Sequence, residues 1–313
     1  MRKKSDSFGK ENDLSRKTFF RERNSKRKGM VMNGIIGQRI KNKKQEEGYI
    51  VDFVKKGDSK YVFVRFDYMD ESDKEKQFVY PDAINKYLFV MDESFDIKSF
   101  EKDIEKSEIE RFLRERSIKL LFHVTRIENL ESILEKGIIP RDALPENAIS
   151  NDIYRYDKKT DCNCLSVGRP NNKYFSRYIH NTEEPTAFVC LCISPNLLLD
   201  ENIKYYCHHN AATSSISDDL AKEKLCTSED FKHMFDERVE AWSPIKGDII
   251  IARRPGDPPY CTTSIQAEIL YKGVIGPESI VGVDFPDKQS CENSFEILRR
   301  YKKRGTVRKY INF

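Results

Sequence analysis

The sequence lacks both phosphate-binding signatures of the common nucleotide folds. It has no Gly-rich dinucleotide fingerprint and no P-loop. Both signatures use glycines so that backbone amides can approach a phosphate closely. Their absence argues against a dehydrogenase, a kinase or an NTPase, and leaves open enzymes that hold a nucleotide in another way.

Long apolar segments are also missing. The longest apolar run covers residues 187–193, far short of the roughly 20 residues that a membrane helix needs. The N-terminus is charged throughout and has no apolar stretch of the kind found in secretory signals. We therefore expect a cytoplasmic protein that makes no membrane contact.

None of the eight cysteines has the C-x₂₋₄-C spacing of a zinc site. Cys162 and Cys164 stand two apart, as do Cys190 and Cys192, which lie in the longest apolar run. We expect reduced thiols, as in a cytoplasm, with Cys190 and Cys192 buried as small apolar side chains. We expect no bound metal.

Positive charge is present but unevenly placed. Residues 1–28 hold eleven Lys and Arg against four Asp and Glu, whereas the whole chain has a net charge of only +4. A basic arm at residues 1–30 can bind a phosphate backbone through counterion release, and a solvated tail would have the same composition. The 313 residues leave room for one large domain and one small one.

Residues 31–92 predict a small all-β domain. Runs of β-branched and aromatic residues at 47–54, 61–67 and 76–80 are separated by turn residues, which is typical of an antiparallel meander. An SH3-like barrel is its natural closure, and the segment resembles SH3-like modules appended to bacterial enzymes. Apolar residues then recur at helical spacing, so we expect residues 93–117 to form a connecting helix.

Residues 118–313 mix strand and helix patterns without regular βαβ alternation, which indicates an α+β domain. We expect a strand at 120–123 and then a helix with a capping box formed by Thr125 and Glu128, which ends at Gly137. Further strands are expected at 186–193, 247–252, 264–271 and 280–285. Further helices are expected at 228–237 and 291–303.

The triplet Gln266-Ala267-Glu268 lies in the strand expected at 264–271. Residues two apart on a strand point to one face, so Gln266 and Glu268 would project together. A carboxylate there can bind a sugar hydroxyl, stabilise an oxocarbenium-like charge and accept the proton of an incoming nucleophile. An ordinary solvent-facing edge strand would carry the same triplet.

Other segments carry polar groups that suit a ligand without proving one. His123 ends the first expected strand, and Asn129 lies in the first turn of the helix that follows. Asn210 precedes small residues that would allow a ligand or a backbone to approach closely. Each is also compatible with a structural role, which is the more common one for a lone histidine.

Taken in chain order, these segments form a pattern. Its parts are His123-x-Thr125 with Asn129-Leu130, Asn151-Asp152, Ser166 with Pro170-Asn171 and Lys173-x-Phe175, Asn210-Ala211-Ala212, and Gln266-Ala267-Glu268. The pattern resembles the DarT family, toxins that ADP-ribosylate bases of single-stranded DNA. The match covers about residues 118–286 and does not include the arm or the barrel.

The resemblance implies a PARP-like ADP-ribosyltransferase fold after the small barrel, with NAD as cosubstrate. Carried over by position, Glu268 is the catalytic glutamate. His123, Thr125, Asn129 and Asn210 are then expected to line the NAD pocket.

The third motif departs from the family pattern. Members with Pro-Arg in this motif use that arginine in catalysis, whereas this chain has Pro170-Asn171-Asn172-Lys173. Lys173 is expected to supply the positive charge, with Arg169 as the alternative.

The segment before Glu268 suits an acceptor strand. Arg253 and Arg254 offer cations for phosphates, Tyr260 offers a ring for base stacking, and Gln266 is expected to contact the acceptor. A surface loop with ordinary charges would look the same.

The resemblance thus predicts a toxin that modifies a base of single-stranded DNA or RNA, with DNA favoured. Its expected setting is toxin–antitoxin or anti-phage defence, with a cognate antitoxin protein as partner. Two alternatives stay open: the same fold acting on messenger RNA or protein, and a non-catalytic nucleic-acid-binding module that has lost the usual arginine.

Overall fold

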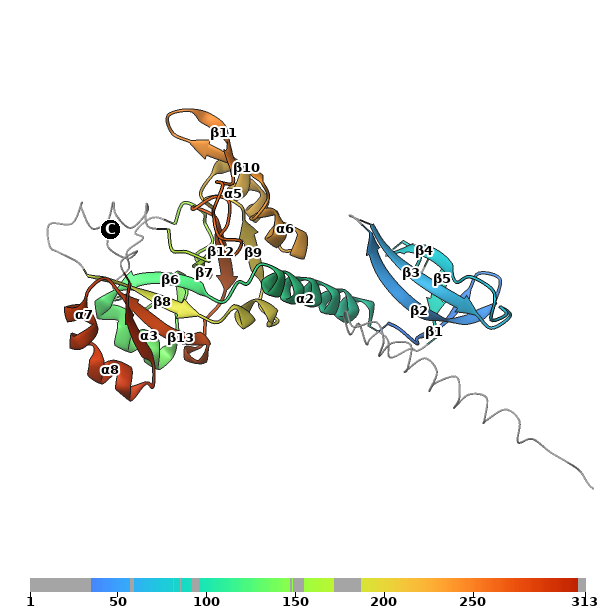
Figure 1. Cartoon of the computed structure of the whole chain (residues 1–313), viewed down its shortest axis with the longest axis horizontal. Helices are drawn as coiled ribbons and strands as arrows, with labels where there is room; N and C mark the ends of the chain where they lie inside the picture. Colours follow the sequence, from blue (N-terminus) through green and yellow to red (C-terminus); the bar gives the residue numbers. More distant parts are fainter. Residues whose placement is uncertain are drawn as a thin grey trace, which may run out of the picture. The chain divides into compact units, whose positions relative to one another are not determined.

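A computed structural model of the chain is shown in Figure 1. It describes residues 35–56, 59–80, 82–84, 86–91, 96–146, 148, 155–171 and 187–308. The chain divides into two compact units, residues 1–107 and 108–313, and each is described by itself. The expected basic arm and Asn151, Asp152, Lys173 and Phe175 lie outside the described residues.

The first unit is an antiparallel five-stranded sheet in the order β4-β3-β2-β1-β5. Its strands are β1 (Arg39–Asn42), β2 (Glu47–Lys56), β3 (Ser59–Phe66), β4 (Lys76–Tyr80) and β5 (Leu88–Val90). The expected meander is confirmed in β2, β3 and β4, whereas β1 and β5 were not predicted. The curled sheet is consistent with the expected small barrel-like module (Figure 1).

Alternating burial along these strands builds the core of the first unit. Ile40, Ile50, Val62 and Val64 are fully buried and share one cluster. Gly48 lets two backbones meet, because a Cβ there would stand 2.5 Å from the carbonyl oxygen of Arg65. A shift of register between residues 50 and 52 of β2 adds a bulge, and bulges bend the strand that carries them.

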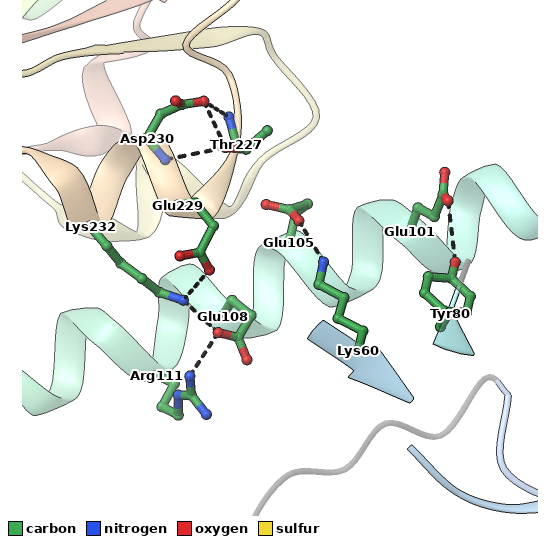
Figure 2. A network of polar contacts seen from close by, with 10 residues as sticks. All are labelled: Lys60, Tyr80, Glu101, Glu105, Glu108, Arg111, Thr227, Glu229, Asp230 and Lys232. Atoms are coloured by element: carbon green, nitrogen blue, oxygen red, sulfur yellow. Dashed lines mark hydrogen bonds and ion pairs between the residues drawn. The ribbon is translucent and has the colours of Figure 1, made fainter. Parts of the chain in front are cut away.

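Helix α2 (Ile97–Glu115) confirms the helix expected at residues 93–117, and the division between the two units falls inside it. In the first unit, Nζ of Lys60 donates to Glu105 and the hydroxyl of Tyr80 donates to Glu101, both at 3.3 Å (Figure 2). In the second unit, Nζ of Lys232 donates to the buried carboxylate of Glu108 at 2.6 Å. Each end of the helix is therefore fastened by polar contacts within its own unit.

The second unit is built on a seven-stranded sheet in the order β14-β13-β8-β6-β7-β12-β9. Its strands are β6 (Leu121–Arg126), β7 (Cys162–Val167), β8 (Phe188–Ile193), β9 (Lys204–Cys207), β12 (Glu268–Lys272), β13 (Ile280–Phe285) and β14 (Arg304–Val307). Among the described strands of this sheet, only β13 and β14 pair in parallel. A separate hairpin joins β10 (Arg238–Ser243) to β11 (Gly247–Ala252).

Helices cover both faces of this sheet. They are α3 (Leu130–Lys136), α5 (Ser214–Ala221), α6 (Ser228–His233), α7 (Lys288–Asn293) and α8 (Phe295–Arg300). Alternate residues of β12 enter different cores: Ile269 and Tyr271 join the large cluster that includes residues of α3, α6 and α8. Leu270 joins Ile216 and Leu220 of α5. The mixed architecture confirms the predicted α+β class.

Two predicted helix boundaries were wrong. The helix expected at 291–303 is two short helices, α7 and α8, separated at Ser294, whose hydroxyl donates to the carbonyl of Ser290 at 2.9 Å. Such back-bonding competes with regular helix geometry. The helix expected at 228–237 ends at His233.

The capping prediction was also wrong, although the helix end was right. Thr125 lies inside β6, so the chain passes through a turn at Ile127–Asn129 before α3 begins. Gly137 ends α3 with φ +87° and donates its amide to Ile133 at 2.8 Å. Among the described residues, no helix combines the length and apolarity required to cross a bilayer.

Candidate active site

Glu268 is the first residue of β12, and a turn precedes it. The strand expected at 264–271 therefore begins four residues late, and Gln266 lies in the turn. Ser264 closes this turn: its hydroxyl accepts from the amide of Gln266 at 3.1 Å, and its carbonyl accepts from Ala267 at 3.1 Å. The prediction that Gln266 and Glu268 share one face of a strand was wrong.

The carboxylate of Glu268 is held from two sides. The amide of Ala211 donates to its Oε1 at 2.8 Å, and the thiol of Cys164 on the neighbouring strand β7 also hydrogen-bonds to it. Burial raises the pKa of Glu268 to about 7, against the effect of these two hydrogen bonds. A carboxyl group with such a pKa exchanges protons near neutral pH, as a general base must.

His123 lies on β6, and its side chain contacts the backbone of Cys164, the residue whose thiol contacts Glu268. β6 pairs with β8 along six residues but with β7 only at Leu121 and Phe122. Beyond that point the carbonyl of Cys164 meets Nδ1 of His123 at 2.9 Å. A carbonyl only accepts, so Nδ1 carries the proton and Nε2 is an acceptor. Burial lowers the pKa of His123, which keeps the ring neutral at neutral pH.

Thr125 and Asn129 continue the site from His123. Thr125 stands two residues further along β6, on the same face, and is buried. Nδ2 of Asn129 donates to Oγ1 of Thr125 at 3.2 Å. The turn after β6 therefore brings the three predicted residues together.

Asn210 shapes the turn that carries Ala211. Its Oδ1 accepts from the amide of Ala212 at 2.8 Å, which is the geometry of an Asx turn. The turn aims the amide of Ala211 at Glu268. The preceding residue, His209, is buried, and its Nδ1 lies 2.8 Å from the hydroxyl of Ser264. The same turn therefore also contacts the segment that leads into Glu268.

Arg155 also belongs to this candidate site, although no sequence motif pointed to it. Its guanidinium donates to the carboxylate of Asp157 at 3.0 and 2.7 Å and to the carbonyls of Cys162 and Lys159 at 3.1 and 2.8 Å. The positive charge lowers the pKa values of Glu268 and His123. The local sequence gives no periodic signal here, because the ion pair forms in an irregular segment.

The segment before Glu268 packs against the end of β7. Gly168 has φ +74°, and a Cβ there would stand 2.2 Å from the carbonyl oxygen of Tyr260. Arg169 reaches Asp257 at 3.3 Å. The third predicted motif and the predicted acceptor segment are therefore in direct contact.

The two arginines of the acceptor segment differ. Arg253 donates to the carbonyls of Cys261 and Pro258 at 2.9 and 2.6 Å, so its side chain braces the segment. Arg254 is exposed, and Tyr260 is 39% exposed. Of the three, Arg254 and Tyr260 are the side chains that this fold presents outward.

Of the two cations proposed for the third motif, Lys173 lies outside the described residues and Arg169 is paired with Asp257. Cys190 and Cys192 are buried in β8, as predicted. Within the residues that the structure describes, no group of three or more His, Cys, Asp or Glu is arranged to hold a metal ion.

The α+β sheet thus carries a glutamate, a neutral histidine and a buried arginine in one candidate site. The family described as "ssDNA thymidine ADP-ribosyltransferase, DarT" matches residues 122–312. The chain belongs to the DarT family, as the sequence motifs indicated. It is thus an ADP-ribosyltransferase, a class of enzyme that takes its ADP-ribose from NAD.

Similar solved structures include DarT proteins of two organisms. The chain is similar to Thermus sp. 2.9 DarT in complex with NAD+, at 16% identity and a TM-score of 0.40, over 62% of this chain and 98% of that one. The same DarT in complex with ADP-ribosylated ssDNA is 15% identical, with a TM-score of 0.42, over 63% of this chain and 97% of that one. Thermosipho africanus DarTG in complex with ADP-ribose is 15% identical, with a TM-score of 0.39, over 62% of this chain and 51% of that one. No curated protein sequence matches the chain.

Proposed function

We propose that this chain transfers ADP-ribose from NAD to thymine in single-stranded DNA, with Glu268 as the catalytic carboxylate. The observation that carries the proposal is the placement of Glu268 beside Cys164, whose carbonyl contacts His123. One residue of β7 thus ties the carboxylate of β12 to the imidazole of β6. The acceptor is taken from the description of the family, and the catalytic groups are taken from the arrangement of Glu268 and His123.

Glu268 acts on both partners of the transfer. NAD supplies an electrophilic ribose carbon when its bond to nicotinamide breaks, and a nearby carboxylate stabilises the positive charge that develops. Thymine in a DNA strand has one ring N–H, at N3. Glu268 takes that proton as N3 bonds to the ribose carbon, and nicotinamide leaves with the electrons of the broken bond.

His123, Thr125, Asn129 and Asn210 form the NAD side of the site. The neutral ring of His123 presents Nε2 as an acceptor for a ribose hydroxyl. Arg155 supplies the positive charge that the third motif lacks, and its ion pair with Asp157 keeps its guanidinium in place. Lys173, the cation expected from the sequence, stays a second candidate for this charge.

The acceptor strand approaches from the segment 253–263. Arg254 contacts a phosphate, Tyr260 stacks on a base, and Gln266 reads the base from the turn before Glu268. A base that is already outside a duplex avoids an unstacking cost of a few kcal/mol. This favours a single strand as substrate.

The test is transfer of labelled ADP-ribose by the purified full-length chain. Single-stranded oligonucleotides with and without thymine, their duplexes, the matching RNA and cell protein are compared, and the modified base is identified by mass spectrometry. We expect label on thymine-containing single-stranded DNA and none with Glu268→Ala. Preferential labelling of RNA or protein, or equal transfer by Glu268→Ala, would overturn the assignment.

We further propose that the enzyme acts as a cytoplasmic toxin, in a toxin–antitoxin or anti-phage setting with a cognate antitoxin. Single-stranded DNA is exposed at replication forks, so modified bases there would halt growth. Expression of the wild type should arrest a bacterial host, whereas expression of Glu268→Ala at equal level should not. Growth unaffected by the active enzyme would refute the toxin role.

A further inference from the structure

The outer edge of the first unit carries an unusual row of exposed apolar side chains. Tyr87, Phe89 and Met91 are 45%, 43% and 44% exposed, whereas Leu88 between them is fully buried. Phe89 lies in β5, and Tyr87 and Met91 directly flank this strand. The exposure of all three side chains places them on the outside of the sheet edge. Exposed apolar side chains that gather on one surface mark a site where a partner can bind.

Lysines surround this row. Lys41 of β1 stands directly opposite Phe89 in the strand register. Nζ of Lys43 lies 5.2 Å from the centre of the Tyr87 ring, and Nζ of Lys86 lies 5.3 Å from it. The carboxylate of Glu47 lies 3.6 Å from Nζ of Lys41 and is shared with Arg39 at 3.2 Å. Each of the two aromatic rings thus has at least one lysine beside it on this surface, named here the β5 face.

We propose that the β5 face, formed by Tyr87, Phe89, Met91, Lys41, Lys43 and Lys86, binds single-stranded nucleic acid. Exposed aromatic rings stack on unpaired bases, and neighbouring lysines neutralise the phosphates between them. A duplex hides the faces of its bases from such rings. Protein interfaces are depleted in lysine, so the lysines argue against a protein as occupant.

This contact is separate from the chemistry of the second unit. A strand held at the β5 face stays at a raised effective concentration around the enzyme, because the two units belong to one chain. The gain applies to strands long enough to reach both units. A thymidine dinucleotide occupies only the catalytic site and would gain nothing.

The experiment measures binding of a long fluorescent single-stranded oligonucleotide by anisotropy. The full-length protein carries Glu268→Gln, so that binding is read without modification of the strand. Tyr87→Ala and Phe89→Ala should each raise Kd about 5- to 100-fold, the range for loss of one stacked base. Lys43→Ala with Lys86→Ala should weaken binding and flatten its dependence on salt. Val79→Ala, on the opposite edge strand and 51% exposed, is the matched control and should change nothing.

Two further measurements keep the outcome decisive. Tyr87→Phe retains a stacking ring and should keep the wild-type Kd, whereas a folding defect in Tyr87→Ala would show in its thermal unfolding. Unchanged Kd in both alanine variants, or an equal loss in Val79→Ala, would overturn the proposal. In the active enzyme, transfer to a thymidine dinucleotide should be the same with and without Tyr87→Ala. A chain that binds normally but transfers nothing would count against the proposed function and not against the β5 face.

Discussion

The amide of Ala211 donates a 2.8 Å hydrogen bond to Oε1 of Glu268. The donor comes from the turn after β9, the strand that pairs with β12 at Glu268. The hydrogen bond fixes the carboxylate while burial opposes its ionisation. The site thus holds in a fixed position a carboxyl group that ionises near neutral pH. Above that pH the buried charge lowers the stability of the folded chain.

Replacing Glu268 by Gln should lower transfer and raise stability. The amide oxygen of Gln still accepts from Ala211, but it cannot take a proton, so kcat should fall about 10²- to 10⁴-fold. Burial raises the pKa of Glu268 from 4.5 to about 7 in the folded chain. The folded wild type therefore loses stability relative to Glu268→Gln as pH rises through this window, by about 3 kcal/mol in full.

Thermal unfolding at several pH values checks this expectation. Glu268→Gln and wild type should unfold together near pH 4, at or below the unfolded pKa, and the variant should unfold at a higher temperature near pH 8. Glu135→Gln, which changes an exposed residue of α3, is the control and should show no such pH dependence. A variant that is less stable than wild type at the higher pH would contradict the buried, raised-pKa carboxyl group.

The pH dependence of transfer should follow the same carboxyl group. Glu268 must be ionised to take a proton, so kcat/KM should rise with pH and reach half of its plateau near 7. The thiol of Cys164 lowers the pKa of Glu268. Cys164→Ala should therefore move the midpoint to higher pH, whereas Cys164→Ser keeps a hydrogen-bond donor and should move it less. A midpoint that stays the same in Cys164→Ala would show that another group governs the profile.

The sequence motifs pointed to residues that the fold brings together, but they did not predict the local geometry around them. Glu268 and His123 could be singled out because a short motif surrounds each. The strand expected through Gln266 was wrong, because Ser264 closes a turn whose side-chain hydrogen bonds leave no periodic trace. The residue types in this segment favour a strand. The turn is instead stabilised by the contact between Ser264 and His209, which is distant in sequence.

Arg155 shows a second limit of prediction from the sequence. Its place beside Glu268 depends on an ion pair with Asp157 and on carbonyls of the segment leading into β7. None of these contacts has a spacing that a single sequence reveals. Helix α2 was predicted closely because its buried residues Ile104, Ile109, Phe112 and Leu113 recur at helical spacing. Strands β11 and β13 were predicted closely because each contains a run of β-branched residues.

Two substitutions at His123 should separate its two ring nitrogens. Asn places an amide N–H near Nδ1, so His123→Asn can still donate to the carbonyl of Cys164, but it has no counterpart of Nε2. We expect this variant to stay folded while KM for NAD rises about 5- to 100-fold, as for one lost buried partner. His123→Ala should lose both stability and NAD affinity. Steady-state kinetics at saturating DNA, with thermal unfolding alongside, measures both. Wild-type KM for NAD in His123→Asn would remove His123 from the NAD side of the site.

A pair of glycine substitutions should test the contact between β7 and the acceptor segment. Gly168 and Gly256 both have positive φ, +74° and +88°, so alanine at either position costs about 1–2 kcal/mol of backbone strain. They differ in surroundings: a Cβ at Gly168 would stand 2.2 Å from the carbonyl oxygen of Tyr260, whereas nothing lies within 4 Å of one at Gly256.

Gly168→Ala must therefore displace the backbone that carries Tyr260, and Gly256→Ala need not. We expect Gly168→Ala to raise KM for single-stranded DNA well beyond the effect of Gly256→Ala, while KM for NAD stays near wild type in both, because His123 and Thr125 lie on β6. The two KM values are measured by varying each substrate with the other saturating. Equal effects of the two substitutions on KM for DNA would mean that the packing of Gly168 against Tyr260 does not position the acceptor strand.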